Sequence, residues 1–499
     1  MPNFTDLPYE IRLDILEGLL KGVRNSNSTS ADHLPIFAVV CKEWQNVFER
    51  ETFRQLILSP SRVRDLYQNI KHRKAYVKHI HYYVELTKYP CGACASQESP
   101  ERISANNVIA TREISQLFEV LSHWSENGAC TKDDLTLELS SFSPSDSKHY
   151  FKNHQFDAFF YSDHDDFSQN PRARRLTPRV SDGSHRWDHA HDLVPQHPIP
   201  LNLLARWRVH GKPLEIQQKL SKVEVVTRLL IRRQSYRAFG PKALRHILES
   251  LPRLRQIHVE SWRSLFHLSQ LGLDAGEYQD MEVLLRRCMP TMLKELTLYE
   301  DYDGFYELFE TNINRSSLPQ FATTILDAST QLESLAVSFV IDARDFFHPL
   351  SPTKDLALPN FPRLQFVILT SHELSLDKSP KAINNLLYAA GNTALKMPKL
   401  QVMELWNGRR GEAAIFRSWD FVFDPEVVNR WREVAFRHRC AELVTKSDRI
   451  PAPPICPGSI LKYLYLRHRI LSPLSLYQIQ QEADEAQDAQ AWGAASSIA

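Results

Sequence analysis

The chain has 499 residues, 43% of them hydrophobic, and its 60 basic and 59 acidic residues leave a formal net charge of +1. This balance gives no long-range electrostatic reason to expect a nucleic acid or an anionic membrane as a partner. Seven cysteines are few and odd in number, which favours a reducing compartment over a disulfide framework. Because we find neither a signal-peptide pattern nor an apolar run of membrane-spanning length, we expect a cytoplasmic or nuclear protein.

Three short apolar helices are predicted within residues 1–58. Pro8 suits the first position of a helix, where its missing N–H is not needed, and Ile11, Ile15 and Leu16 follow at helical spacing. A second helix is predicted near residues 34–40 and a third after it. A unit of this size is marginal alone, so it is either a helical cap packed on the rest of the chain or a docking element for another protein.

The order of motif elements in this stretch resembles the F-box, the motif that docks on a Skp-type adaptor of cullin-RING ubiquitin ligases. Those elements are Leu7-Pro8-x-Glu10-Ile11, then Ile15-Leu16, then Val40-Cys41-x-x-Trp44. One departure is a polar insertion, Lys21 to His33, which is longer than the usual link between the first two helices. The resemblance implies that the adaptor contacts Leu7, Pro8, Ile11, Ile15, Leu16, Val40, Cys41 and Trp44.

A pattern of apolar-x-x-apolar-x-apolar recurs along the rest of the chain. Its period-two ending predicts a strand with one buried face. A looser copy is Leu135-x-Leu137-x-Leu139. The regular copies begin at Val77, Val226, Leu254, Leu293, Leu332, Leu364 and Leu400.

Amphipathic helices are predicted before most of these strands, at residues 114–124, 241–251, 281–288, 318–328 and 382–395. Repeated helix-then-strand units are typical of a leucine-rich-repeat solenoid. The spacing is uneven, at 39, 39, 32 and 36 residues from Leu254 to Leu400, and no polar residue ladder follows the strands. We therefore predict an irregular α/β solenoid, with an ordinary α/β domain as the alternative.

Three further segments complete the expected domain organisation. A polar insertion at about 143–200, rich in His, Asp, Arg and Pro, interrupts a repeat domain at 59–411. A C-terminal capping segment at 412–479 contains a helix starting near Asp424 and an apolar helix from Ile460 to Leu471. Residues 480–499 are expected to be a frayed helix and a loose tail.

The sequence shows no established catalytic motif. Cys91 and Cys94 form the only Cys-x-x-Cys pair, with His79 and His81 just upstream. Two Cys and two His are a possible zinc set, but loop thiols beside a strand are the simpler interpretation. We predict no catalytic residues, no metal and no cofactor.

The predicted strands also define a candidate target-binding face. If the leucine-type residues point toward the helices, their neighbours point to the opposite face of the sheet. That row carries large aromatic and basic side chains of the kind that anchor interfaces. The alternative is that the insertion or the C-terminal helices cover this face. The candidate partner-binding residues are Arg228, Arg232, His258, Tyr299, Phe366, Ile368 and Trp406.

Taken together, these features resemble fungal-type F-box proteins with a divergent leucine-rich-repeat body. The resemblance implies a substrate receptor of an SCF-type ubiquitin ligase, which binds a Skp-type adaptor with its cullin and an unidentified protein target, and performs no chemistry itself. Two alternatives stay open: an F-box interaction protein acting outside ubiquitination, and a metal-dependent enzyme using the His, Cys and Asp segments.

Overall fold

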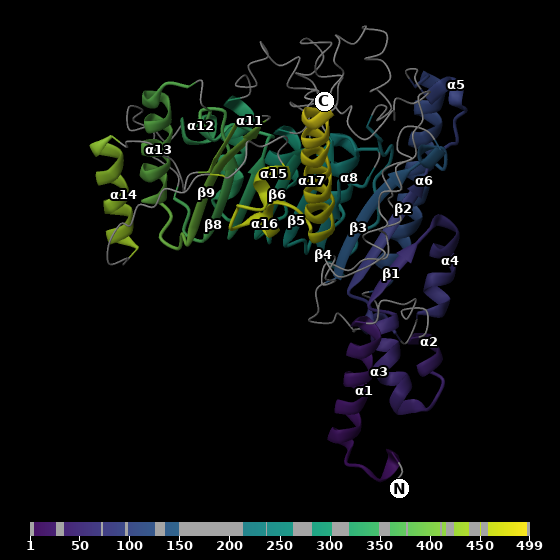
Figure 1. Cartoon of the computed structure of the whole chain (residues 1–499). Helices are drawn as coiled ribbons and strands as arrows, with labels where there is room; N and C mark the ends of the chain where they lie inside the picture. The colour runs from purple at the N-terminus through teal and green to yellow at the C-terminus, as the bar shows by residue number, and fades with distance from the viewer. Residues whose placement is uncertain are drawn as a thin grey trace.

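The computed structural model of the chain shows a mixed α/β protein, drawn in Figure 1. None of its described helices is long and apolar enough to cross a membrane. The described residues are 4–25, 34–70, 73–94, 98–124, 135–148, 213–235, 237–262, 282–301, 319–348, 360–375, 378–409, 412–415, 424–438, 450 and 458–496.

A single ten-stranded sheet runs through the described residues, with its strands side by side in chain order. The first nine are parallel and the tenth is antiparallel to the ninth. Each repeated apolar pattern forms a strand, as predicted, whereas the short β1 and β10 were not predicted. The strands are β1 (Gln55–Leu58), β2 (His79–Glu85), β3 (Leu135–Phe142), β4 (Val226–Ile231), β5 (Gln256–Trp262), β6 (Glu295–Asp301), β7 (Ser334–Ser338), β8 (Phe366–Thr370), β9 (Val402–Arg409) and β10 (Glu412–Ile415).

The register of the sheet aligns the repeated apolar positions with one another. Ile257 of β5 pairs with Leu296 of β6, which pairs with Leu335 of β7, and the row continues through Val367 and Met403. These side chains belong to, or pack against, the main hydrophobic core between the sheet and its helices. The predicted buried face is therefore confirmed.

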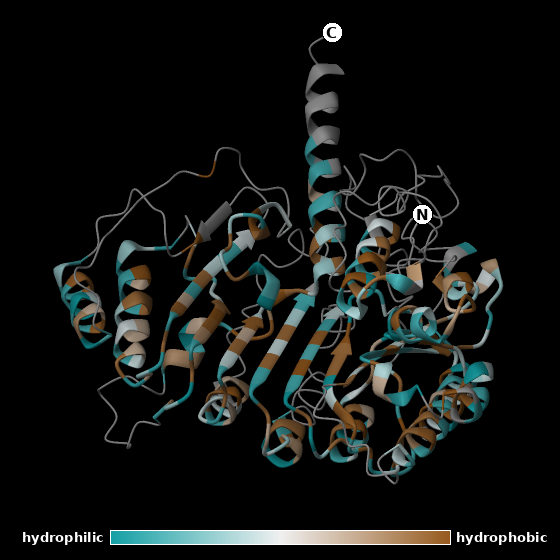
Figure 2. Cartoon of the chain, turned by 90° about the horizontal axis from the view of Figure 1, so that it is seen from below, coloured by the Kyte–Doolittle hydropathy of each residue, from teal (hydrophilic) through white to brown (hydrophobic). Residues whose placement is uncertain are grey.

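One face of this sheet is lined by a layer of helices. The helices within residues 458–496 lie on the opposite face (Figures 1 and 2). The predicted helices at 241–251, 318–328 and 382–395 are confirmed within a few residues, and residues 282–288 are helical as predicted. The helix predicted at 114–124 is longer and begins at Pro100. The helices of this layer are α4 (Pro60–Asn69), α6 (Pro100–Ser122), α8 (Pro241–Glu249), α11 (Pro319–Ser329), α12 (Ala343–Phe347), α13 (Pro380–Ala394) and α14 (Pro425–Arg437).

Helix α14 continues this layer beyond α13. Its Trp431 Nε1 donates a hydrogen bond to the Leu387 carbonyl at 3.0 Å, and its Val427 is buried in the main core. Asp424 precedes α14 and Pro425 occupies its first turn, a position that proline favours. The helix expected at the Asp424-Pro425 start is thus confirmed, and it covers the outer side of α13.

Several expected boundaries are wrong. Residues 460–471 do not form one helix but two short ones, α15 (Gly458–Leu461) and α16 (Arg467–Ile470), joined by a turn. A helix is present within residues 480–499 as expected, but it starts earlier, because residues 480–496 continue the helix α17 (Pro473–Ser496). Residues 21–25 end the first helix, so the polar insertion does not begin at Lys21; residues 26–33 lie outside the described residues.

The insertion expected at 143–200 also begins later than predicted. Residues 143–148 form a packed turn that ends in the short helix η4 (Asp146–Lys148). The Asp146 carboxylate accepts hydrogen bonds from the Tyr89 hydroxyl at 2.7 Å and the Ser143 amide at 2.6 Å. These polar residues fold because their groups satisfy one another. Residues 149–200 lie outside the described residues.

The buried Glu113 of helix α6 is expected to make the free energy of unfolding depend on pH. Burial raises the pKa of Glu113 to about 7, and its Oε2 has no hydrogen-bond partner in the described structure. Because the folded pKa exceeds the unfolded one, ionisation penalises the folded state: the penalty is absent below about pH 4.5 and complete above about pH 7. We expect Glu113→Gln to raise the free energy of unfolding by about 1–3 kcal/mol at pH 8.

Thermal unfolding at pH 8 and pH 5 tests this prediction. At pH 5 the carboxyl of the parent protein is mostly protonated in the folded state, so the substitution should change the melting temperature far less. The exposed Glu119 on the same helix is the control, and Glu119→Gln should have little effect at either pH. Equal stabilisation by Glu113→Gln at both pH values would show that Glu113 is not the group responsible.

Candidate functional site

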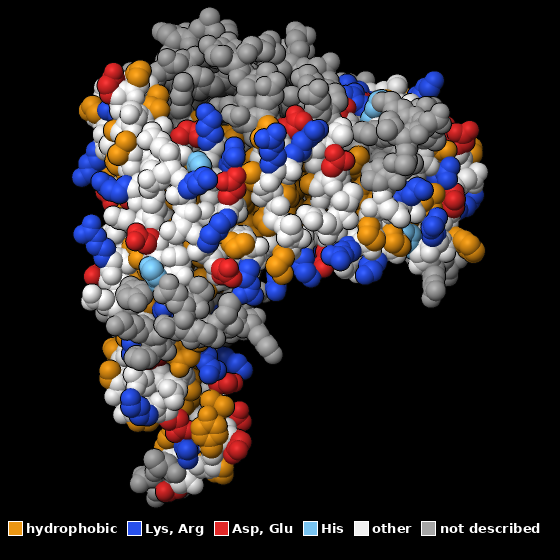
Figure 3. Space-filling model, turned by 180° about the vertical axis from the view of Figure 1, so that it is seen from behind, with side chains coloured by type: hydrophobic (Ala, Val, Ile, Leu, Met, Phe, Trp, Pro, Cys, Tyr) orange, Lys and Arg blue, Asp and Glu red, His pale blue; other side chains and the backbone are white. Residues whose placement is uncertain are grey.

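The N-terminal helices form a small domain with its own hydrophobic core, which projects from the β1 end of the sheet (Figures 1 and 3). Its helices are α1 (Tyr9–Asn25), α2 (Leu34–Phe37) and α3 (Lys42–Thr52), preceded by η1 (Phe4–Asp6). Leu16, Leu34 and Phe48 are its buried residues. The indole of Trp44 stacks on Phe48 at 5.6 Å between ring centroids and also contacts Phe37. Trp44 therefore supports the core from its edge.

Two polar contacts fix the geometry of this domain. The guanidinium of Arg12 on α1 pairs with Glu43 on α3 at 3.1 Å and also donates to the Leu7 carbonyl at 2.6 Å. The hydrogen bond from Arg73 lowers the pKa of Glu49, and the two side chains lie 2.6 Å apart. The first contact ties the chain start to α1 and α3, and the second ties α3 to the segment before β2.

The surface of this domain carries a concentration of exposed apolar side chains. Six of the twelve exposed large hydrophobic residues in the described chain lie between positions 9 and 40. Soluble monomers rarely leave apolar side chains clustered in water, so such a cluster marks a contact surface. Figure 3 shows hydrophobic side chains, in orange, on the surface of the projecting domain. We use the name apolar face for these six exposed residues, which lie on α1 and on or just after α2: Tyr9, Ile11, Ile15, Ile36, Val39 and Val40.

The predicted adaptor-binding residues divide into two groups. Pro8, Ile11, Ile15, Val40 and Cys41 are exposed. Leu7 and Trp44 are half-buried, and Leu16 is fully buried, so these three support the surface from beneath. Sequence reasoning missed Tyr9, Ile36 and Val39, although Tyr9 directly follows Pro8 and Val39 directly precedes Val40.

The second candidate surface, the sheet face opposite the helix layer, is not open. Tyr299, Ile368 and Trp406 are fully buried beneath residues 458–479, which we call the covering segment. The expectation that these three side chains contact a partner is wrong, because the chain's own apolar residues take that place. Arg232 is also buried. Arg228 is exposed, and His258 and Phe366 are half-buried.

The apolar side chains between the sheet and the covering segment form a second hydrophobic core. Tyr299, Phe339 and Trp406 lie at its centre. Phe339, which follows β7, has a positive φ of 64°, a conformation that is costly for a bulky residue. In this position its ring packs edge-on against Trp406 at 4.9 Å and against Tyr299 at 5.9 Å. The packing of this cluster offsets the backbone strain.

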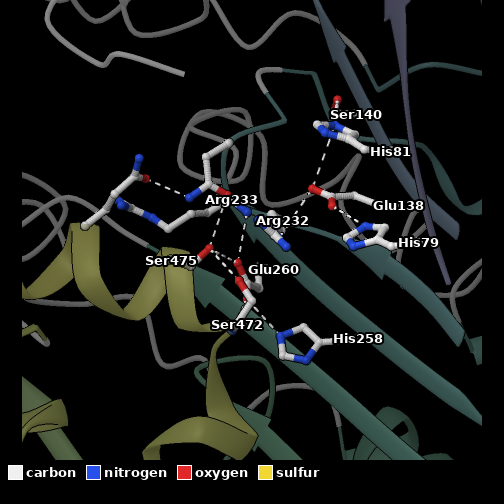
Figure 4. Close-up of polar contacts among 12 residues, drawn as sticks. His79, His81, Glu138, Ser140, Arg232, Arg233, His258, Glu260, Ser472 and Ser475 are labelled. Atoms are coloured by element: carbon white, nitrogen blue, oxygen red, sulfur yellow. Dashed lines mark hydrogen bonds and ion pairs between the residues drawn. The ribbon is translucent and has the colours of Figure 1, made fainter. Parts of the chain in front are cut away.

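Two buried carboxylates of the sheet hold the covering segment in place (Figure 4 shows the first). Glu260 accepts hydrogen bonds from the Ser472 amide at 2.6 Å, the Ser475 hydroxyl and the Arg233 amide. Burial raises the pKa of Glu260, but His258 at 2.8 Å and these donors outweigh it and lower the pKa overall. Glu404 likewise accepts from the amides of Tyr465 and Leu466.

A third buried carboxylate, Glu138 of β3, forms a polar cluster with side chains of β2 and with Arg232, which follows β4. It lies 3.3 Å from Arg232 and 2.8 Å from His79, while His81 bonds Ser140 at 2.7 Å (Figure 4). Burial lowers the pKa of His81 to about 4, so this ring is neutral at pH 7. Burial acts to raise the pKa of Glu138, but the charge of Arg232 with the two imidazoles brings it well below its usual range.

His79 and His81 occupy alternate positions of β2 and so point to the same side of the strand, where both face Glu138. The described residues contain no group of three or more His, Cys, Asp or Glu side chains arranged to hold a metal ion. Cys91 is exposed in the short helix α5 (Cys91–Cys94), and the placement of the Cys94 side chain lies outside the description. Glu138 pairs with Arg232, and the two histidines complete a buried polar cluster around its carboxylate.

Comparison with known families adds one match. Residues 288–472 match a protein-family model described as a family of unknown function, DUF6546. The match covers less than half of the chain. It begins in the helix before β6 and ends inside the covering segment, so it includes β6 to β10 and residues 458–472 of the covering segment. No curated protein matches the chain.

Proposed function

We propose that this protein is the substrate-recognition subunit of an SCF-type ubiquitin ligase. It docks on a Skp-type adaptor through residues 1–58 and presents a protein target on the sheet domain. The observation that carries the proposal is the apolar face, because it exposes Ile11, Ile15 and Val40 at positions of the F-box-like pattern. The buried Leu16 and half-buried Trp44 support that surface from a core separate from the sheet's.

The sheet domain suits the role of a rigid target platform. We propose that it is a divergent leucine-rich-repeat array, supported by the in-register apolar rows from β5 to β9 and by the chain order of the strands. Such arrays stack units that each contact mainly their neighbours. The platform holds the target at a fixed distance from the adaptor, and the protein itself carries out no bond chemistry.

Adaptor docking is tested with substitutions on the apolar face. Full-length chain carrying Ile11→Asp with Ile15→Asp should bind the purified Skp-type adaptor of the native host about 100-fold more weakly, because a few apolar anchors dominate interfaces of this kind. The matched control is Val108→Asp with Val283→Asp, two exposed valines on other helices. Binding is measured by titration calorimetry, and the melting temperature of each variant checks its fold.

The same experiment separates the two F-box interpretations. Co-purification of the cullin with wild-type chain, lost in the Ile11 and Ile15 variant, supports the ligase. Adaptor binding without cullin indicates an interaction protein outside ubiquitination. Wild-type affinity in the double variant contradicts the docking assignment altogether.

A further inference from the structure

The covering segment buries the sheet face beneath it and presents its own outer surface to the solvent. Its apolar side chains point to the sheet, and Leu464, Leu466 and Ile470 are buried in the second core. The residues between them face the solvent: Tyr465 is 62% exposed and Tyr463 is 39% exposed. We call this surface the tyrosine patch, formed by Lys462, Tyr463, Tyr465, Arg467 and His468.

The backbone beneath the tyrosine patch is held rigidly. Glu404 accepts the amide hydrogens of Tyr465 and Leu466 at 2.9 and 3.0 Å, so the turn between α15 and α16 is fixed to β9. Further along, the Arg469 guanidinium stacks on the Phe366 ring at 3.8 Å, and its carbonyl accepts from the Thr297 hydroxyl. A surface fixed in this way loses little conformational entropy when a partner binds.

The charge of the patch is of one sign. Residues 458–481 contain no Asp or Glu, whereas Lys462, Arg467 and Arg469 are cationic. The ammonium of Lys462 lies over the Tyr463 ring at 5.5 Å, and Arg467 donates to the carbonyls of Lys462 and Leu464. The nearby carboxylate of Glu404 is occupied by amides and faces inward. Exposed tyrosines beside cations therefore offer apolar contact together with anion binding.

We propose that the tyrosine patch is a docking surface for an acidic peptide segment of a partner protein. Tyrosine and arginine are enriched among interface residues that dominate binding, and clustered cations read acidic motifs. Nucleic acid is the less favoured occupant, because the chain has a net charge of +1 and nucleic-acid surfaces carry extended basic patches. The inference deepens the proposed function by naming the site and chemistry through which the target binds.

The proposal is tested with a phage-displayed library of random 12-residue peptides selected on the full-length chain. The selected peptides should be enriched in Asp and Glu. The best of them, made as a fluorescent peptide, should bind at least tenfold more weakly to Lys462→Glu and to Tyr463→Ala with Tyr465→Ala. A serine-phosphorylated version and an alanine-for-acid version of that peptide distinguish phosphate from carboxylate recognition.

Two control variants make similar changes to exposed residues outside the tyrosine patch. Lys242→Glu reverses an exposed lysine on α8, and Phe436→Ala removes an exposed ring on α14; both should keep wild-type peptide affinity. The proposal is overturned if the selected peptides are not enriched in Asp and Glu. It is also overturned if the variants of the tyrosine patch bind the peptide as tightly as the wild-type chain does. Stronger binding of a 20-nucleotide single-stranded DNA, lost in the same variants, also overturns it. Adaptor binding is measured separately on each variant, so failure of the docking assignment is seen independently of the patch.

Discussion

Replacing Trp406 by alanine should lower the free energy of unfolding by about 3–5 kcal/mol, as truncation of a buried tryptophan does. Trp406 is fully buried between β9 and the covering segment. Its ring contacts Phe339 at 4.9 Å, and its strand partner on β10 is the buried Ile415. The substitution removes packing on both sides and leaves a cavity that fixed backbones on either side cannot close.

Urea unfolding of the full-length chain measures this cost. The control is Phe436→Ala, which truncates a ring that is 85% exposed on α14 and should change the free energy by about 0.5 kcal/mol or less. If Trp406→Ala costs no more than this control, the covering segment does not pack on the sheet as described. A large loss instead excludes Trp406 as a partner-binding residue, because a buried core side chain does not reach a partner.

The outcome at Trp406 shows which part of the sheet the sequence can predict. The period-two pattern correctly placed Leu335 and Trp406 on opposite faces, because alternation is a local property of a strand. What covers the second face is a long-range property. The apolar character of Tyr299, Ile368 and Trp406 fitted a binding surface and a buried core equally well, and only the position of residues 458–479 separates the two.

The N-terminal domain was predictable for a related reason. Its motif positions lie within one short stretch, so helical spacing alone places Ile11, Ile15 and Leu16 on one helix. The sequence did not separate the exposed Ile11 and Ile15 from the buried Leu16, because that difference depends on contacts with α2 and α3. Glu260 and Glu404 alternate with the leucine-type residues and so belong to the second face by the same pattern, but nothing in the sequence indicates their role. Each is the single acid of its strand. The backbone amides that donate to them lie 212 residues beyond Glu260 and 61 residues beyond Glu404.

Loss of the Glu260 carboxylate should release one end of the covering segment. Glu260→Ala removes the acceptor of the Ser472 amide, the Ser475 hydroxyl and the Arg233 amide. Each buried donor left without a partner costs about 1–3 kcal/mol, so we expect a loss of about 3–5 kcal/mol, similar to breaking a buried ion pair. Limited proteolysis should then cleave within residues 458–496 much faster than in the parent chain.

The pH dependence of the parent protein provides a second readout of the same carboxylate. Because the folded pKa of Glu260 lies below its unfolded value, its stabilisation is complete above the unfolded pKa and is lost as pH falls through the folded one. Glu260→Ala should therefore lose stability most at neutral pH and approach the parent protein as pH falls through the lowered folded pKa of Glu260. Glu333→Ala, which removes only a surface pair with Lys294, should cost at most about 1 kcal/mol. Equal protease resistance in the Glu260 variant and the parent chain would mean that apolar packing alone holds the segment, and that the buried carboxylate is not its anchor.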